Sequence, residues 1–388
     1  MTEFLLTAKR ALTPNEKVSP AALAVRDGRI IYCGPDAEQA RKLVPRAEQF
    51  DFPDATLAPG FVDLHVHGAL GLDFYDCPPG RIGEVTAFFA RHGTTTLLAT
   101  ITTGDLAQME RAVTALAAYS SDPNPEGSWM PGVYLEGPFV SEARRGTFRP
   151  EYLRMPDWQL LASWVERFPG LFRFVGLAPE LPGADIVIER LRAAGISVCI
   201  CHTDASHRDL SRAVDLGASH ITHFYNGMRP FLHRDPGVVG GVLAGADVSA
   251  ELVCDYHHVH PLAIDVLMCC LGPGRVCLIT DAMRATGCPP GEYIISEQIA
   301  VVRNGKAVIG ANTLAGSILT MDQAVRNMLA LGYGEQDVIT MASATPARIA
   351  GLDDRGSLAP GQVADIVILD SEYQVLATLL AGKRIIHK

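Results

Sequence analysis

Six side chains that can bind a metal ion or carry a proton follow short apolar runs of this sequence. They are His65, His67, Glu136, His202, His223 and Asp281. Because His65 and His67 are two residues apart, both imidazoles face the same side of a strand end and can hold one ion. Imidazole and carboxylate ligands suit zinc, iron(II), manganese or cobalt, and the residue types alone do not choose among these metals.

Each of these residues also has an ordinary structural explanation. A single histidine at the end of a strand is more often a hydrogen-bonded structural residue. Glu136 precedes Gly-Pro and can cap a loop, while Asp281 can cap a helix. Chance accounts for one or two such placements. The full set, at the same end of five different runs, indicates a metal site.

Eight apolar runs, most of them separated by amphipathic stretches, must position these side chains. The runs span residues 58–67, 94–100, 130–137, 172–180, 196–202, 219–224, 248–255 and 275–281. Eight strand–helix repeats predict an α/β protein with a (β/α)8 TIM-type barrel, in which chemistry takes place at the carboxyl ends of the strands. A doubly wound open sheet is the alternative, but no Gly-x-Gly-x-x-Gly follows the first strand. Residues 292–310 predict a hairpin inserted after the eighth strand.

Both ends of the chain are rich in short strands and turns. A strand–turn–strand pattern surrounds Asp27-Gly28, and the last 30 or so residues have the same character. We therefore expect a small β-sandwich domain formed by residues 1–58 together with 352–388. Residues 59–351 are expected to form the metal-dependent catalytic barrel.

Composition excludes several classes of partner. The chain has 388 residues, is 48% hydrophobic and carries a formal net charge of −10. This acidic balance argues against a nucleic-acid or membrane-surface binder. Nine cysteines without disulfide-like spacing, no signal peptide and no long apolar span predict a cytoplasmic protein. Cys199-x-Cys201 beside His202 could suggest a thiolate metal site, but no second cysteine pair completes a zinc set.

The motifs around these residues resemble those of a known family. PGFVDLHVHG (59–68) looks like the opening metal motif of the amidohydrolase superfamily, and GSLAPGQVADIVILD (356–370) resembles its closing strands. Further segments resemble the N-acetylglucosamine-6-phosphate deacetylase family: LEGPF (135–139), LAPE (177–180), THFYNGM (222–228), TDAM (280–283) and LAGSILTMDQAVRN (314–327). Many other relatives use a modified lysine on the fourth strand, and the fourth run here has none.

This resemblance implies a metal-dependent amidohydrolase that removes the N-acetyl group of an N-acetylhexosamine 6-phosphate, foremost N-acetylglucosamine 6-phosphate. It implies that Glu136, His202 and His223 hold the principal ion. His65 and His67, sharing Glu136, hold a second ion in members that have two. One or two divalent ions per subunit are expected, with zinc foremost and iron, manganese or cobalt as alternatives.

The implied reaction also requires a group that moves a proton. Neutral water is a poor nucleophile, and an amine anion cannot leave near neutral pH. Asp281 is expected to accept the proton of the attacking water and to pass it to the leaving nitrogen.

Further positions match the substrate contacts of the family. The expected substrate-binding residues are Asn226, Gly227, Arg234, His258, Leu314, Ala315 and Gly316. Arg234 lies where the family places a phosphate-binding arginine, which reaches across from a neighbouring subunit and implies a homodimer. His258 lies where the family places a phosphate-contacting histidine. Alternatively, Arg234 pairs with its neighbour Asp235, and the histidines around residue 258 form a solvated turn.

One departure from the family pattern concerns the segment after LEGPF. The family usually has Lys/Arg-Gly-Ala-His there, and the histidine helps to polarise or position the acetyl carbonyl. Phe148 occupies that position here and cannot donate a hydrogen bond. Either the metal acts alone, or Arg145 or another donor replaces the histidine, or the preferred substrate differs.

Other functions therefore remain open at this point. N-acetylgalactosamine 6-phosphate differs at one hydroxyl group, and another N-acyl amino sugar is possible. The missing fourth-strand lysine argues against hydantoin or dihydroorotate chemistry. A non-catalytic sugar-phosphate-binding protein is a further alternative, because a barrel alone does not establish activity.

Overall fold

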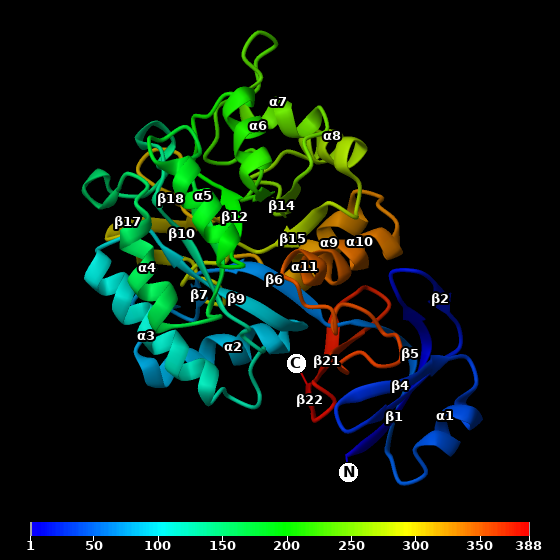
Figure 1. The fold of residues 1–388 in the computed structure, drawn as a ribbon. Helices are drawn as coiled ribbons and strands as arrows, with labels where there is room; N and C mark the ends of the chain where they lie inside the picture. The colour runs from blue at the N-terminus through cyan, green and yellow to red at the C-terminus, as the bar shows by residue number, and fades with distance from the viewer. Residues whose placement is uncertain (1, 388) are drawn as a thin grey trace.

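The structure is a computed structural model that describes residues 2–387, and its centre is a barrel of eight parallel strands (Figure 1). In ladder order the strands are β6 (Phe61–Val66), β9 (Thr94–Thr102), β10 (Val133–Phe139), β11 (Phe172–Leu177), β12 (Ser197–Ile200), β13 (Ala218–Ile221), β14 (Ser249–Val253) and β15 (Val276–Ile279). Each lies within one of the eight predicted apolar runs or overlaps it. The predicted TIM-type barrel is confirmed.

The barrel closes between its first and last strands. Val66 forms a parallel bridge with Ala282, and the Asp281 amide donates to the His65 carbonyl oxygen over 3.0 Å. Below this point, the Thr280 hydroxyl donates to the buried Asp63 carboxylate over 2.6 Å. We refer to this junction of β6 with residues 280–282 as the seam.

Helices surround the strands (Figure 1). They are α2 (Ile82–Arg91), α3 (Leu106–Ser121), α4 (Trp158–Arg167), α5 (Ala184–Ala193), α6 (His207–Leu216), α7 (Gly237–Leu243), α8 (Pro261–Leu271), α9 (Met321–Ala330), α10 (Glu335–Ala342) and α11 (Ala344–Ile349), with short 3-10 turns at Pro79–Arg81, Glu142–Arg144 and Pro150–Tyr152. Helix α6 shows why they form where they do. Ser206 and Asp209 make a reciprocal capping box at its start, and Gly217 ends it with a φ of 121°.

The small β domain combines both ends of the chain. Its elements are β1 (Glu3–Leu12), β2 (Lys17–Val18), β3 (Ala21–Arg26), β4 (Arg29–Gly34), α1 (Ala37–Leu43), β5 (Glu48–Pro59), β20 (Ile366–Leu369), β21 (Val375–Leu380) and β22 (Arg384–His387). Side chains from β1, β3, β4, β5, β20 and β21 share one buried apolar cluster. Asp27 and Gly28 make the predicted turn between β3 and β4, with φ of 48° and 81°.

A four-stranded antiparallel sheet follows the eighth barrel strand and contains the hairpin that the pattern of residues 292–310 predicts. Its strands are β16 (Gly291–Ile295), β17 (Gln298–Arg303), β18 (Lys306–Ile309) and β19 (Thr313–Leu314). Ile295, Ala300 and Val302 pack its inner face against Met283 and Ala315. A two-stranded ribbon of β7 (Gly68–Ala69) and β8 (Leu72–Asp73) follows β6.

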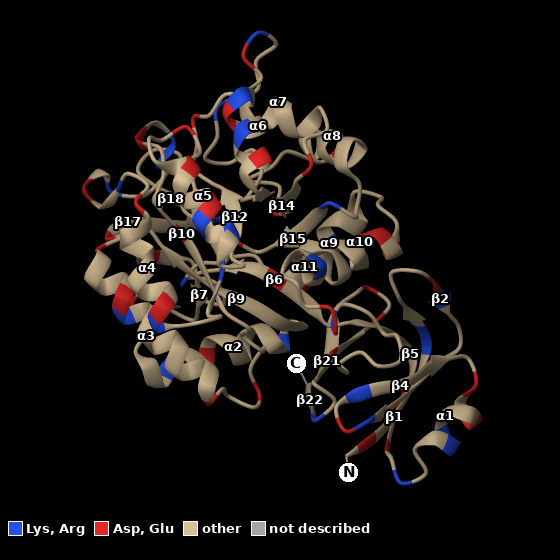
Figure 2. Ribbon diagram, in the orientation of Figure 1, with Lys and Arg blue, Asp and Glu red and all other residues tan. Residues whose placement is uncertain are grey.

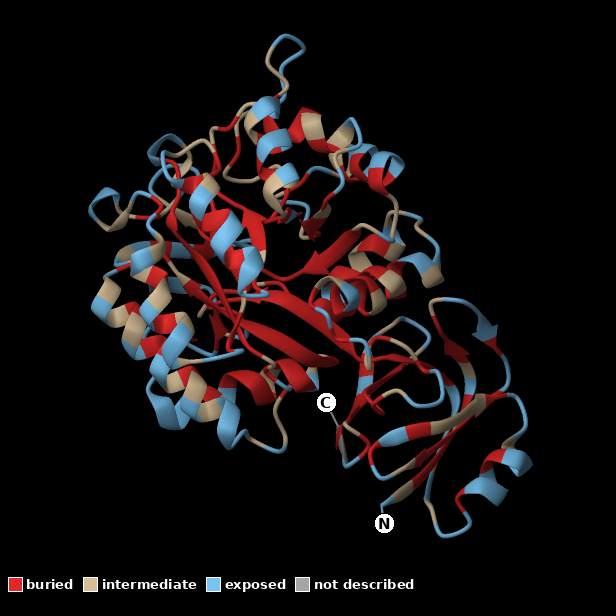
Figure 3. Cartoon of the chain, viewed as in Figure 1, coloured by how far each residue is buried: buried red, intermediate tan, exposed pale blue. Residues whose placement is uncertain are grey.

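Burial and charge follow this architecture. The barrel strands are buried along nearly their whole length, whereas the outer helices alternate buried and exposed positions (Figure 3). Lysine, arginine and acidic side chains lie mostly on helices and loops at the periphery (Figure 2). None of the described helices is long and apolar enough to span a membrane.

Candidate active site

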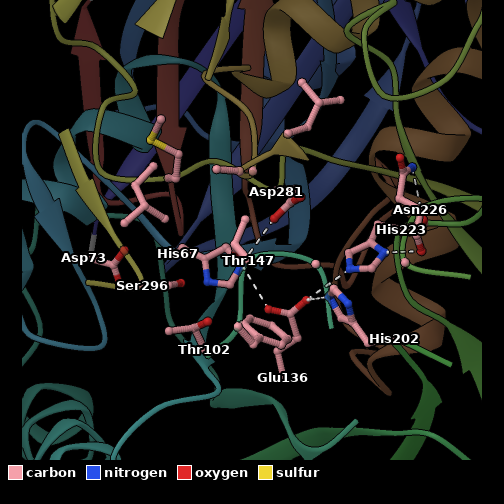
Figure 4. Close-up of a pocket in the computed structure, with 18 of the residues that line it drawn as sticks. His67, Asp73, Thr102, Glu136, Thr147, His202, His223, Asn226, Asp281 and Ser296 are labelled. Carbon is pink, nitrogen blue, oxygen red and sulfur yellow. Dashed lines mark hydrogen bonds and ion pairs between the residues drawn. The ribbon is translucent and has the colours of Figure 1, made fainter. Parts of the chain in front are cut away.

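The six predicted metal or proton-carrying residues meet at the carboxyl end of the barrel (Figure 4 shows five of them). His65 lies near the end of β6, with His67 just beyond it, and Glu136 lies within β10. His202, His223 and Asp281 each stand two residues beyond the last residue of β12, β13 and β15. All six side chains are buried.

Three of these residues have an unusual backbone conformation. The φ angles of His202, His223 and Asp281 are 42°, 26° and 50°. Side chains other than glycine disfavour this left-handed region, at a cost of roughly 1–3 kcal/mol each. In each case the conformation occurs where the chain leaves its strand, and all three side chains line the cavity. Strain concentrated in this way is typical of a functional site.

Glu136 is the common partner of the histidines. Its Oε1 lies 3.2 Å from His202 Nε2 and 3.1 Å from His223 Nε2. Its Oε2 lies 3.5 Å from His67 Nε2. The glutamate therefore faces both groups of histidines.

His65, His67 and Asp281 form a second group beside it. The Nε2 atoms of His65 and His67 lie 3.1 Å apart. Asp281 Oδ1 lies 3.2 Å from His67 Nε2 and 3.6 Å from His65 Nε2. The ligand atoms of these three residues all lie within 4.8 Å of one another.

These donor atoms fit a metal ion. Ligands of one ion at metal–ligand distances of about 2.1 Å are themselves about 3.4 Å apart. The Nδ1 atoms of His202 and His223 lie 2.8 Å and 3.1 Å from the backbone carbonyl oxygens of Arg144 and Asn226. Their Nδ1 atoms can therefore donate to these carbonyls, and their Nε2 atoms are directed into the site, as is usual for metal-binding histidines.

The electrostatics keep both carboxylates ionised. Burial alone raises the pKa of Glu136, but hydrogen bonds from His202 and His223 and the charges of His65 and His67 hold it well below its usual value. Burial likewise opposes ionisation of Asp281, and its hydrogen bond with His67 lowers its pKa overall. The site can thus accept a cation without a carboxylic acid first losing its proton.

Cys201 is the thiol considered as a ligand. Its Sγ lies within 4.8 Å of ligand atoms of Glu136 and His202. Burial raises the pKa of this thiol well above its usual value, so the thiolate form is disfavoured. The geometry therefore favours histidine and carboxylate ligands.

Two glycines hold the His202 ring. A Cβ atom on Gly227 would lie 2.8 Å from His202 Nδ1, and one on Gly146 would lie 3.1 Å from Cε1. Both glycines have φ near 60°. Close approach and left-handed backbone together require glycine at these positions.

The candidate metal site opens into a pocket with about 790 Å³ of empty space, including its solvent-filled mouth. Eleven of the predicted residues line it: His67, Glu136, His202, His223, Asn226, Gly227, His258, Asp281, Leu314, Ala315 and Gly316. His65 lies outside the cavity wall but contacts His67.

Arg234 does not line this cavity. It is exposed on the loop of residues 229–236, the projecting green hairpin in Figure 1. Asp235, its suggested partner, instead accepts a hydrogen bond from Arg229 over 2.8 Å. Phe231 and Leu232 on the same loop are each 56% exposed. The structure separates Arg234 from the other predicted substrate-binding residues of its own chain.

His258 reaches the cavity wall with support from a carboxylate. Its Nδ1 lies 2.7 Å from Asp255 Oδ2, and the backbone amides of His257 and His258 both donate to Asp255 Oδ1. The second ring nitrogen of His258 is left for a ligand. The turn suggested as an alternative exists, but it holds His258 nearly buried at the cavity.

Phe148 forms an apolar part of the wall. Its ring centroid lies 4.6 Å from that of His202, and the side chain packs with Val140 and Cys201. Arg145, suggested as a replacement donor, does not line the cavity and donates to the Phe148 carbonyl oxygen.

Other parts of the wall were not predicted from the sequence. They are Asp73, Tyr75, Thr102, Gly146, Thr147, Met283, Arg284, Ile295 and Ser296.

Ile295 and Ser296 come from the β16–β17 hairpin, which is joined to the opposite wall. Gln298 Nε2 donates to the Thr147 carbonyl oxygen over 2.7 Å, and Glu297 contacts Arg149 and Tyr152. We call these contacts the hairpin clasp. Only the strand pattern of the hairpin, and not this contact, was visible in the sequence.

Comparison with known proteins adds to this geometry. A family model described as the amidohydrolase family matches residues 56–385. N-acetylglucosamine-6-phosphate deacetylase from Bacillus subtilis is 35% identical over 388 residues, covering 98% of this chain and 97% of that protein. N-acetylgalactosamine-6-phosphate deacetylase from Escherichia coli O157:H7 is also 35% identical, over 381 residues and 98% of both chains.

A solved structure agrees with these sequence matches. A mutant of N-acetyl-D-glucosamine-6-phosphate deacetylase from Mycobacterium smegmatis, in complex with N-acetyl-D-glucosamine 6-phosphate, is similar with a TM-score of 0.90. The two chains are 33% identical, and the match covers 98% of this chain and 99% of that one.

Proposed function

The chain belongs to the amidohydrolase family and, within it, to the N-acetylglucosamine-6-phosphate deacetylases. We therefore propose that it hydrolyses N-acetylglucosamine 6-phosphate to glucosamine 6-phosphate and acetate. The observation that carries the proposal is the convergence of histidine Nε2 atoms on Glu136 and Asp281 at one end of the cavity. A non-catalytic binding protein has no need of Asp281 at that point.

The residues of this chain perform the proton transfers. A divalent ion bound by this set supplies a Lewis acid that makes water more acidic and polarises an amide carbonyl. Asp281 accepts the proton of the attacking water at its carboxylate. It then donates that proton to the amide nitrogen as the C–N bond breaks, so that a neutral amine leaves. His67 Nε2 lies 3.2 Å from the Asp281 carboxylate.

The ligands could serve one ion or two. Glu136, His202 and His223 would hold the principal ion, and His65 and His67, together with Glu136, would hold a second one in a two-ion form. Zinc is the proposed metal, because three or four nitrogen and oxygen ligands at these separations suit its small tetrahedral shell. Iron, manganese and cobalt remain the alternatives to be compared in the assay.

We propose that His258 binds the phosphate group, with Asn226-Gly227 and the backbone of residues 314–316 around the sugar, because all of these residues line the cavity. Arg234 contacts the phosphate of the substrate that is bound in a neighbouring subunit, so the active form is a homodimer. The exposed position of Arg234 beside the apolar Phe231 and Leu232 supports an intersubunit role.

The wider setting follows from composition. All nine cysteines are free in the structure, in keeping with a reducing compartment, and we propose a cytoplasmic location. The partner is a small amino-sugar phosphate and not a nucleic acid or membrane.

An acetate-release assay tests the function. Metal-free protein is reconstituted with zinc, iron(II), manganese or cobalt and given N-acetylglucosamine 6-phosphate, its galacto epimer or the unphosphorylated sugar. The gluco phosphate is expected to react fastest. Faster release from the galacto epimer would establish the alternative substrate. The similarity to the Escherichia coli N-acetylgalactosamine-6-phosphate deacetylase supports this alternative. No acetate from any of the three would overturn the deacetylase proposal, and equal rates without phosphate would remove the roles of Arg234 and His258.

A further inference from the structure

Glu251 is a carboxylate in the interior of the barrel that is not part of the proposed ligand set. It lies at the centre of β14, and its side chain is fully buried. Such positions are usually filled by branched apolar side chains, and a buried charge is costly unless it is paired. The carboxylate therefore needs an explanation in terms of its partners.

Three donors from two other strands surround it. Glu251 Oε2 lies 3.0 Å from His65 Nδ1 and accepts the backbone N–H of His223 over 2.8 Å. Its Oε1 lies 3.2 Å from Nε2 of the buried His220. Glu251 thus joins β6 and β13 directly beneath the metal site.

We propose that Glu251 is a positioning residue for the second ion: it holds His65 with Nε2 directed toward that ion and supplies a negative charge behind it. A carboxylate can only accept, so His65 carries its proton on Nδ1. The Nε2 lone pair then faces His67 and Asp281, which lie 3.1 Å and 3.6 Å away. This inference rests on the proposed binding of a second ion by His65 and His67.

The negative charge of Glu251 should stabilise the second ion more than the principal ion. Two divalent ions bring four positive charges, against two negative charges on Glu136 and Asp281. His202 and His223 pair their Nδ1 atoms with neutral carbonyl oxygens, whereas the partner of His65 is ionic. An anion behind a histidine makes it a stronger ligand. Loss of the charge should therefore weaken the second ion more than the principal one.

Glu251→Gln isolates this charge. The amide oxygen can accept from His65 and His223, while the amide NH₂ donates to His220 Nε2. His220 then carries its proton on Nδ1, where the Ser249 hydroxyl, 2.7 Å away, can accept it and donate in turn to the Ser219 carbonyl oxygen. Each of these hydrogen bonds survives, so the metal-free variant is expected to fold, and circular dichroism checks this before the titration.

The test is a zinc titration of metal-free protein against a chromogenic chelator, with zinc per chain measured after dialysis. Wild type is expected to bind two ions. The variant is expected to keep the first and to bind the second about 10- to 100-fold more weakly. Glu180→Gln is the matched control, because Glu180 accepts from Thr203 and Asp204 near the site but is not in contact with His65. It should retain both affinities.

The outcomes separate this inference from the proposed function. One ion in wild type would overturn the two-ion proposal and the role of Glu251 with it. Two ions in wild type and an unchanged second affinity in Glu251→Gln would overturn only the role of Glu251.

A measurement on the wild type does not depend on the variant folding. In zinc-loaded protein with ¹⁵N-labelled histidine, the His65 signals, assigned by comparison with His65→Asn, should show a protonated Nδ1 and a metal-bound Nε2. Metal on Nδ1 would refute the assignment.

Discussion

Asp281 is the residue on which we expect hydrolysis to depend most directly. Asp281→Asn keeps the size of the side chain but cannot accept a proton, so turnover should fall by about 10²- to 10⁴-fold, the usual contribution of acid–base catalysis. Metal content and substrate affinity should change little. Acetate release and metal analysis check this, and near wild-type turnover would refute the role.

Gly227 tests the close packing around His202. Gly227→Ala places a Cβ 2.8 Å from His202 Nδ1, so it should displace the ring and weaken the principal ion by about tenfold or more. Gly310→Ala is the control, because Gly310 has nearly the same φ, 62° against 61°, and no heavy atom within 4 Å of its Cβ position. Both variants should share a left-handed strain of about 1–2 kcal/mol, whereas only Gly227→Ala should lose metal in a chelator titration.

Individual residues show what could be predicted from the sequence. The His65-x-His67 spacing and the position of Glu136 before Gly-Pro indicate candidate ligands, because strand ends converge in a barrel. Glu251 could not be singled out, since one acidic residue in the middle of the apolar run VSAELVCD has no pattern of its own. The left-handed φ of His202 and Asp281 is equally invisible, because neither is a glycine.

The β16–β17 hairpin is the element that closes one side of the cavity, through the hairpin clasp. Glu297→Ala removes its contacts with Arg149 and Tyr152, which are largely exposed and worth about 0.2–1 kcal/mol. We expect at most about a fivefold rise in KM, with metal content and kcat retained. Glu84→Ala, which removes an exposed pair with Arg81 elsewhere, should leave KM unchanged. A large loss of kcat would instead place Glu297 in the chemistry.

At the element scale, the eight strands were predictable because each is a short apolar run followed by a polar terminus. Within residues 292–310, the β17–β18 hairpin was predictable from its Asn304-Gly305 turn and strand pattern. Its contact with the opposite wall was not, because Gln298 and Thr147 are 151 residues apart and neither belongs to a recognisable pattern. Long-range loop contacts depend on the finished barrel and leave no local signal.

Metal removal should lower the stability of the whole barrel. An ion that binds only the folded chain stabilises it, by about 2.7 kcal/mol when its concentration is 100 times Kd. Melting followed by circular dichroism should therefore shift to lower temperature in a chelator and recover with zinc. Identical melting with and without metal would argue against a site formed only in the folded protein.

Mixed dimers test the proposed assembly. An Arg234→Ala chain paired with an Asp281→Asn chain creates one site with an intact Asp281 and an intact arginine from the partner. Mixing the two weak variants under conditions that exchange subunits should therefore restore acetate release. If Arg234 acts within its own chain, every site stays defective and mixing restores nothing.

The seam has a consequence for how the protein is made. Asp63 and Thr280, which meet there, are 217 residues apart, and His67 and Asp281 face each other just above them. A ribosome must therefore release nearly three quarters of the chain before His65 and His67 can lie beside Asp281. Until then a nascent or truncated chain has separate ligands but no enzyme, so hydrolysis begins only in a chain whose barrel is complete.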